Sequence, residues 1–159
     1  MSLSPFALLT LATALGAGVI GGVSFAFSSF VMTALARLPP AQGIQAMQSI
    51  NVVVINPVFL GVFLGTALAS AVLVAAALMT WNGPDSIWLL AGGLFYLLGM
   101  FGVTVAINVP RNDALAPLDP SGAEAAASWS RYVGERTAWN HVRTAAAVAA
   151  SACSMIALR

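Results

Sequence analysis

Residues 57–80 read PVFLGVFLGTALASAVLVAAALMT, and no charged side chain interrupts them. An α-helix over this stretch would be about 36 Å long, at about 1.5 Å per residue. The hydrocarbon core of a bilayer is about 30 Å thick. Membrane β-barrels show short segments of alternating apolar and polar residues, whereas this stretch is apolar almost throughout. It therefore predicts a helix that spans a membrane.

The same pattern extends over the whole chain. Its residues are 60% hydrophobic and only 7% charged, and its mean hydropathy is +0.92, whereas soluble domains carry about 25% charged residues. Uncharged runs cover residues 1–36, 38–84, 86–110 and 144–158. We therefore predict an all-α integral membrane protein, one domain over residues 1–159 with a bundle of four transmembrane helices. The four helices are expected at Pro5–Leu35, Pro57–Thr80, Ile87–Asn108 and Ala138–Leu158.

The segment before the second of these helices predicts a short interfacial helix that starts near Pro40. A straight helix from Pro40 to Thr80 would be about 60 Å long, which is twice the thickness of the hydrocarbon core. The chain must therefore bend, and Pro57, directly after Asn56, is the expected position.

The segment before the fourth helix is expected to be a partly helical loop. Pro110 disfavours helix at the residue before it and predicts that the third helix ends at Val109. Residues 121–124, Ser-Gly-Ala-Glu, fit a capping box at the start of an amphipathic helix. That helix either continues through Gly134 into the fourth helix or bends there.

Small residues recur at every fourth position in two of the predicted helices. Such stripes let transmembrane helices approach closely, because packing replaces the hydrophobic effect inside lipid. Tight packing within the chain and a homodimer interface are both consistent with them. The stripes are Ala14, Gly18, Gly22 and Ala26 in the first helix, and Gly61, Gly65 and Ala69 in the second.

The arginine distribution predicts the orientation. With four crossings, both termini lie on one side and the arginine-rich loops before the second and fourth helices lie on the other, which is expected to be cytoplasmic. We therefore expect both termini to face outside, in a bacterial plasma membrane. The lipid bilayer and an apolar or aromatic small molecule are the expected partners. A net charge of +1 with no lysine argues against nucleic-acid binding.

Residues 139–143, Trp-Asn-His-Val-Arg, hold the only histidine of the chain. If Arg159 marks the far membrane boundary, Arg143 lies about 24 Å from it along a helix, and therefore about 6 Å inside the hydrocarbon core. Arg143 could extend to the interface, or face inward and line a pocket. At helical spacing it shares a face with Arg136, Asn140, Ala147 and Ala150, whereas His141 points about 160° away.

Other polar residues cluster near the same membrane face. Asn108, Asn112 and Asp113 surround Pro110, and they either form a turn or face a ligand. Asn51 and Asn56 lie in the loop before the second helix. One histidine and one cysteine, Cys153, cannot build a multi-ligand metal centre in one chain. We therefore expect no metal and no tightly bound cofactor, with a haem shared between two His141 side chains of a dimer as a further alternative.

The chain resembles the anthrone-oxygenase-like family of small four-helix membrane proteins. The resemblance is carried, in this order, by Phe25–Ser28, Arg37–Pro40, Met47–Asn51, Asn56–Pro57, Asn108–Leu115, Trp129, Tyr132 and Trp139–Thr144. It implies oxidation of anthrones to anthraquinones with dioxygen. Members with that role often carry a histidine where this chain has Asn140, and here the histidine follows one position later.

Two hypotheses for the function follow. The first is a cofactor-free oxygenase of a planar phenolic or polyketide-like substrate, with His141 or Asp113 as the base and Arg143, Asn108 and Asn112 stabilising an enolate oxygen. Asn140, Trp139, Asn51 and Asn56 are the further candidate substrate-binding residues. The second is a non-catalytic membrane module that binds a lipid, a quinone or a partner protein.

Overall fold

The computed structural model describes residues 4–159, and the described part is all-α, without a strand, as predicted. Several long helical segments contain π-helical turns, labelled η. The first comprises α1 (Pro5–Ala26), η1 (Phe27–Val31) and α2 (Met32–Ala36), and it is followed by α3 (Pro40–Val53) and α4 (Pro57–Met79). The remaining elements are α5 (Pro84–Leu94), η2 (Phe95–Gly102), η3 (Thr104–Asn108), α6 (Val109–Leu115) and α7 (Ala125–Ile156).

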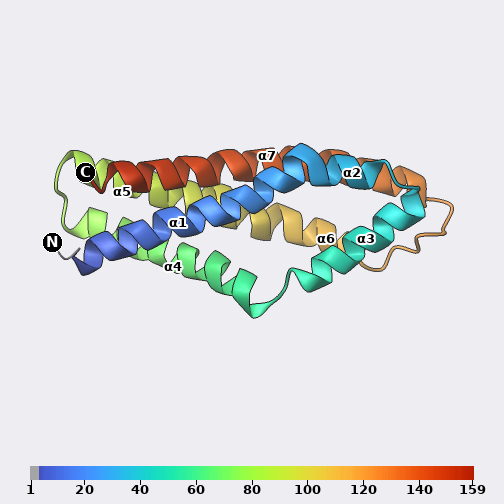
Figure 1. Ribbon diagram of the computed structural model, residues 1–159, viewed down its shortest axis with the longest axis horizontal. Helices are drawn as coiled ribbons and strands as arrows, with labels where there is room; N and C mark the ends of the chain where they lie inside the picture. The colour runs from blue at the N-terminus through green and yellow to red at the C-terminus, as the bar shows by residue number, and fades with distance from the viewer. Residues whose placement is uncertain (1–3) are drawn as a thin grey trace.

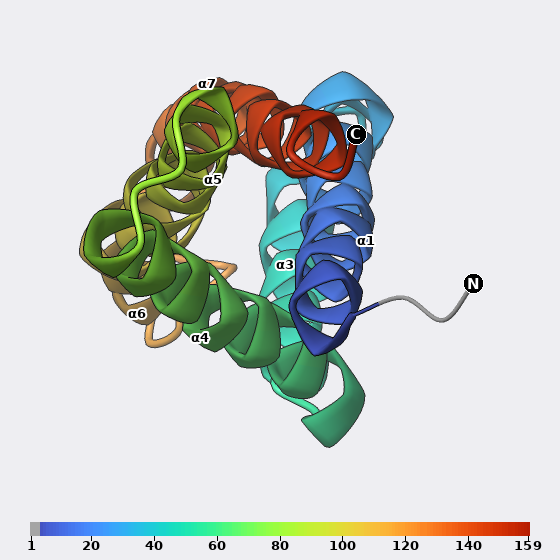
Figure 2. The same ribbon diagram turned by 90° about the vertical axis from the view of Figure 1, so that its left-hand side faces the viewer.

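The long segments lie side by side along one axis (Figures 1 and 2). The start of α1 and the end of α7 lie at one end of this bundle, and α3, α6 and the start of α7 lie toward the other (Figure 1). Three segments are long and apolar enough to cross a membrane: Pro5–Ala36, Pro57–Met79 and Pro84–Leu115. The fourth predicted crossing corresponds to the second half of α7, which carries more polar residues.

A break separates α3 from α4 and forms the bend predicted near Pro57. The Asn56 side chain caps α4, because its Oδ1 accepts a hydrogen bond from the Phe59 amide at 3.0 Å. The predicted short helix is present as α3. Its Ile44 and Met47 side chains are fully buried, so α3 packs into the bundle.

Helix α7 runs without interruption through Gly134, which settles one alternative left open by the sequence. The predicted capping box is wrong: α7 begins at Ala125, and no side chain caps it. Instead, Asp119 Oδ1 accepts hydrogen bonds from the Ser121 amide at 2.9 Å and from its hydroxyl at 2.7 Å. These bonds lower the pKa of the exposed Asp119 carboxyl and form a local turn.

The predicted helix end at Val109 is also wrong, because the helix continues through Pro110 as far as Leu115. In a regular α-helix the proline ring would clash with the carbonyl four residues earlier. Here the π-helical turn η3 directly precedes it, and such wider turns accompany helix distortions. Arg111 Nη1 donates to the Ile107 carbonyl at 3.0 Å, so a side chain satisfies a carbonyl at the distortion.

The α1 stripe packs within the chain in part, since Ala14 is buried and Ser151 Oγ donates to its carbonyl at 2.9 Å. The closest helix contacts use other small residues. A Cβ on Gly21 would lie 3.1 Å from the Ala147 Cβ, and a Cβ on Gly99 would lie 2.5 Å from the Ala146 Cβ. By contrast, Gly61 and Gly65 are exposed, with no heavy atom of another part of the described chain within 4 Å of a built Cβ. The interpretation of the α4 stripe as packing within the chain is therefore wrong.

Two apolar clusters stabilise the bundle on either side of a polar layer. One lies in the middle and includes Ile20, Phe63, Tyr96 and Met100. The other joins α2, α3, α6 and α7. The outside carries many large apolar side chains, as expected for a surface that faces lipid. The polar layer between the clusters contains the cavity described next.

Candidate functional site

A cavity of about 250 Å³ lies inside the bundle, between the two apolar clusters. Its volume is just below the range of about 300–1,000 Å³ that is typical of small-molecule sites, so it suits a compact ligand. Apolar side chains such as Phe59 and Phe63 form most of its wall. Its polar lining residues are Ser24, Asn51, Thr104, Asn108, Asn112, Arg136 and Arg143.

Arg143 extends from α7 into this cavity and is only 8% exposed. Its Nη1 donates to Thr104 Oγ1 at 3.0 Å, and its Nη2 donates to Asn140 Oδ1. With the Asn108 amide oriented so that its oxygen faces the guanidinium, that oxygen accepts from Nε at 2.8 Å and from Nη1 at 3.1 Å. The arginine is therefore held by three neutral acceptors. It faces inward, which is one of the two alternatives that the sequence left open.

Arg136 lies on the same face of α7 and is also 8% exposed. Its Nη1 donates to Asn112 Oδ1 at 2.7 Å, and the Tyr132 hydroxyl donates to the same oxygen at 3.0 Å. Asn112 lies on α6, so this shared acceptor ties α6 to α7 and orients the guanidinium.

The cavity carries positive charge that no neighbouring carboxylate neutralises. Within residues 4–159 the only ion pair joins Arg111 and Glu135, which lie outside the cavity. Among residues 4–159, no carboxylate and no imidazole lines the cavity. An unpaired buried charge is costly, and buried charged groups cluster at functional sites.

Beside the cavity lies a groove of about 480 Å³ between α3 and α6. Groove and cavity share Asn51, Ile55, Val109 and Asn112 as lining residues, so they adjoin there. Asp113 also lines the groove and is exposed. Groove and cavity therefore meet near the break between α3 and α4.

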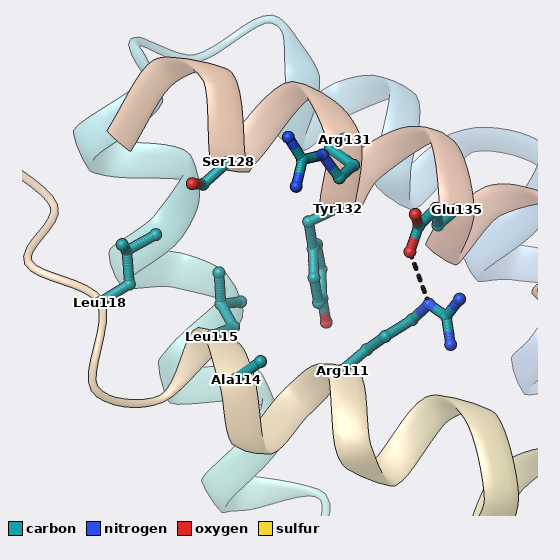
Figure 3. Close-up of a pocket in the computed structure, with 8 residues that line it drawn as sticks. All are labelled: Arg111, Ala114, Leu115, Leu118, Ser128, Arg131, Tyr132 and Glu135. Atoms are coloured by element: carbon teal, nitrogen blue, oxygen red, sulfur yellow. Dashed lines mark hydrogen bonds and ion pairs between the residues drawn. The ribbon is translucent and has the colours of Figure 1, made fainter. Parts of the chain in front are cut away.

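A separate hollow of about 200 Å³ lies between α6 and α7 (Figure 3). The Tyr132 ring stands at its centre, and Arg111 reaches across to Glu135, with 2.7 Å between Nε and Oε2. Both side chains of this ion pair are partly exposed, so it stabilises the fold by at most about 1 kcal/mol. The side chains around this hollow join α6 to α7. The inner side of the same two helices carries Asn112 and Arg136.

The structure brings together five of the candidate site residues: Arg143, Asn140, Asn108, Asn112 and Asn51. The predicted helical phase of α7 is confirmed, since the face of Arg136, Asn140 and Arg143 is buried.

Four other candidates lie outside the cavity. Asn56 caps α4, Asp113 lines the groove, and Trp139 is partly buried but absent from the cavity wall. His141 is exposed on the outer face of α7.

Three polar residues that line the cavity were not among the candidates: Ser24, Thr104 and Arg136. The sequence did indicate Arg136, because its helical spacing places it on the same face as Asn140 and Arg143. No sequence pattern indicated Thr104, since it lies in an apolar run. The π-helical turns η2 and η3 decide which side chains of that run face α7, and no sequence pattern predicted them.

A comparison with protein-family models finds a match over more than half of the chain. The model described as anthrone oxygenase matches residues 57–153, which contain Thr104, Asn108, Arg136, Asn140 and Arg143. No curated protein and no solved structure matches the chain.

Proposed function

We propose that this chain, which belongs to the anthrone oxygenase family, oxidises a planar phenolic ketone with dioxygen in the cavity of Arg136 and Arg143. One observation carries the proposal: two buried arginines line one mostly apolar cavity, and no carboxylate of the described chain lines it. Such a site favours a flat apolar molecule that carries negative charge on oxygen.

The first step of the proposed reaction is loss of a proton from a ring methylene opposite a ketone. The negative charge then rests mainly on the ketone oxygen. Nearby positive charges favour an ionised ligand, and fixed donors in a site shielded from water stabilise developing charge strongly. Arg136 and Arg143 supply these charges.

The proton needs an acceptor. Because His141 is exposed on the outer face of α7, the geometry favours Asp113, which lines the adjoining groove. Apart from the arginines, the cavity offers only amide, hydroxyl and apolar side chains. We therefore assign Asp113 the role of base, acting through water in the groove.

The electron-rich carbanion then reacts directly with dioxygen to give a hydroperoxide on the same carbon, and loss of water leaves a ketone. In sum, a ring CH2 and O2 become a ring C=O and H2O. The methylene carbon loses four electrons, and dioxygen takes them up. No step requires a metal or an organic cofactor.

The proposal includes the placement in the membrane. The second half of α7 would be the fourth crossing, next to the three apolar segments. Arg143 would then lie just inside the cytoplasmic boundary, with both termini outside, in a bacterial plasma membrane. The groove between α3 and α6 would admit an apolar substrate close to that boundary.

A second candidate function is binding without chemistry, of a quinone or a lipid. One observation favours it: the cavity wall within residues 4–159 provides no base of its own. Under this alternative the arginines would bind a ligand oxygen, and no oxidation would follow.

The test is oxidation of anthrone by the purified protein in detergent micelles under air. The reaction is monitored through the absorbance of anthraquinone and through oxygen uptake. We expect one O2 consumed per quinone formed. Loss of one group that stabilises charge in the transition state typically lowers kcat about 10²–10³-fold, and we expect that loss for Arg143→Ala because it removes one of the two positive charges of the cavity. Arg111→Ala, outside the cavity, is the matched control. Quinone formation no faster than in empty micelles, or equal in Arg143→Ala, would refute the oxygenase function and favour binding alone.

A further inference from the structure

The two arginines of the cavity differ in how many of their donors the protein uses. In Arg143, Nε, Nη1 and Nη2 all have partners among Thr104, Asn108 and Asn140. The protein therefore occupies every nitrogen of this guanidinium.

In Arg136, only Nη1 is bound, by Asn112 Oδ1 at 2.7 Å. Nε is fully buried and has no hydrogen-bond partner among residues 4–159. Nη2 has no hydrogen-bond partner within the described chain either, but it is not fully buried. A buried donor of a charged group without a partner is costly and rare in native proteins. The Nε–Nη2 edge of Arg136 is therefore free.

That edge has a defined shape. Nε and Nη2 carry parallel N–H groups in one plane, and this fork matches two oxygens that share one negative charge. Asn112 fixes the guanidinium from the opposite side, and Tyr132 fixes Asn112. The edge is therefore oriented before a ligand binds.

A second unpartnered group belongs to the same cavity. Asn51 Oδ1, on α3, is buried without a hydrogen-bond partner in the described chain. It can accept a hydrogen bond from a hydroxyl group. The free groups of the cavity thus require acceptors on the α7 side and a donor on the α3 side.

We propose that Arg136 holds the substrate directly through its Nε–Nη2 edge, and that the substrate presents there two neighbouring oxygens with one shared negative charge. Arg143 contributes its charge to the cavity, while its hydrogen bonds go to the protein. This inference rests on the proposed function, but it concerns binding and can fail separately. A carboxylate and an ionised hydroxy-ketone both provide such an oxygen pair.

The experiment uses two matched pairs of flat probes that cannot undergo the proposed oxidation. Anthracene-9-carboxylate is compared with 9-anthracenemethanol, and ionised 5-hydroxy-1,4-naphthoquinone with 1,4-naphthoquinone. Dissociation constants are measured by quenching of protein fluorescence in neutral detergent. The first pair reports on a carboxylate, and the second reports on a hydroxy-ketone.

We expect at least one anionic probe to bind about tenfold or more tightly than its neutral partner. Arg136→Lys keeps the charge but loses the fork, so the preference should fall below about threefold. Arg143→Lys and the control Arg111→Lys should retain it. A preference that survives Arg136→Lys, or that disappears equally in Arg143→Lys, would overturn the assignment, as would the absence of any preference in the unmodified protein.

A second measurement needs no folded variant of Arg136. In protein labelled with 15N-arginine, binding of the anionic probe should move the Nε–H resonance of one buried arginine and leave that of Arg143 nearly unchanged. The two resonances are distinguished by Asn112→Ala, which removes the neighbour of Arg136 alone. A shift confined to Arg143 would contradict the proposal. Oxidation of anthrone without this shift would leave the proposed function standing and remove the inference.

Discussion

Replacement of Asn108 by leucine tests the polar layer most directly. The Asn108 oxygen accepts from Arg143 at 2.8 Å and 3.1 Å, and the residue is only 1% exposed. Leucine has a similar size but no acceptor, so two donors of a buried charge lose their partner. Hydrogen bonds to charged groups contribute about 1.5–3 kcal/mol each. Breaking a buried charged network costs about 3–5 kcal/mol. We expect a loss of about 3–5 kcal/mol in the free energy of unfolding.

The assay is unfolding by SDS in mixed micelles, followed by tryptophan fluorescence. Asn82→Leu is the matched control, because Asn82 is exposed in the turn before α5. It should change the free energy by no more than about 0.5 kcal/mol. Asn108→Asp keeps the acceptor and adds a charge that pairs with Arg143. That variant should remain far more stable than Asn108→Leu, but it should bind anions more weakly.

If Asn108→Leu costs less than about 1 kcal/mol while the control behaves as expected, Arg143 does not depend on Asn108 for its place in the cavity. If Asn108→Asp binds anionic probes as tightly as the unmodified protein does, the positive charge of the cavity does not govern anion binding.

Two further predictions concern packing and the loop before α7. A Cβ on Gly43 would lie 2.7 Å from the Trp129 ring, so Gly43→Ala should destabilise the fold by about 1–3 kcal/mol. Gly65→Ala, with open space around it, should stabilise it by about 0.4–1 kcal/mol; equal melting temperatures for the two variants would contradict this. Hydrogen bonds from Ser121 lower the pKa of Asp119. Their stabilisation is therefore present above the unfolded pKa and lost as the pH falls through the lower folded value. Carbon NMR of the Asp119 carboxyl should show a midpoint below about 3.9 that rises in Ser121→Ala; an unshifted midpoint would show that the turn does not form.

The candidate site was partly predictable because helical period alone relates residues of one helix. Arg136, Asn140 and Arg143 recur at spacings of four and three, so they share a face wherever α7 lies. The same period directs His141 away from that face. The bend at Asn56 was predictable too, since helix length and the following proline required it.

Other parts of the site depended on how helices meet. Thr104 and Asn108 contact Arg143 because η2 and η3 widen the helix and set its rotation against α7. Pro110 continues the helix instead of ending it, because η3 precedes it. Neither outcome follows from residue preferences, since π-helical turns have no sequence signature that the chain displays.

From the sequence alone we predicted a helical chain with four membrane crossings, and we predicted which residues of α7 share one face. In the structure, three of the helical segments are long and apolar enough to cross a membrane. These properties follow from composition and from the period of a single helix. Three features appeared only with the tertiary structure. This face of α7 lines a cavity, the Asn108 oxygen accepts hydrogen bonds from Arg143, and the Nε–Nη2 edge of Arg136 has no partner within the described chain. The reason is physical: the position of one helix against another results from side-chain packing across the whole bundle, and hydrogen-bond partners far apart in the chain are selected only when that packing is complete.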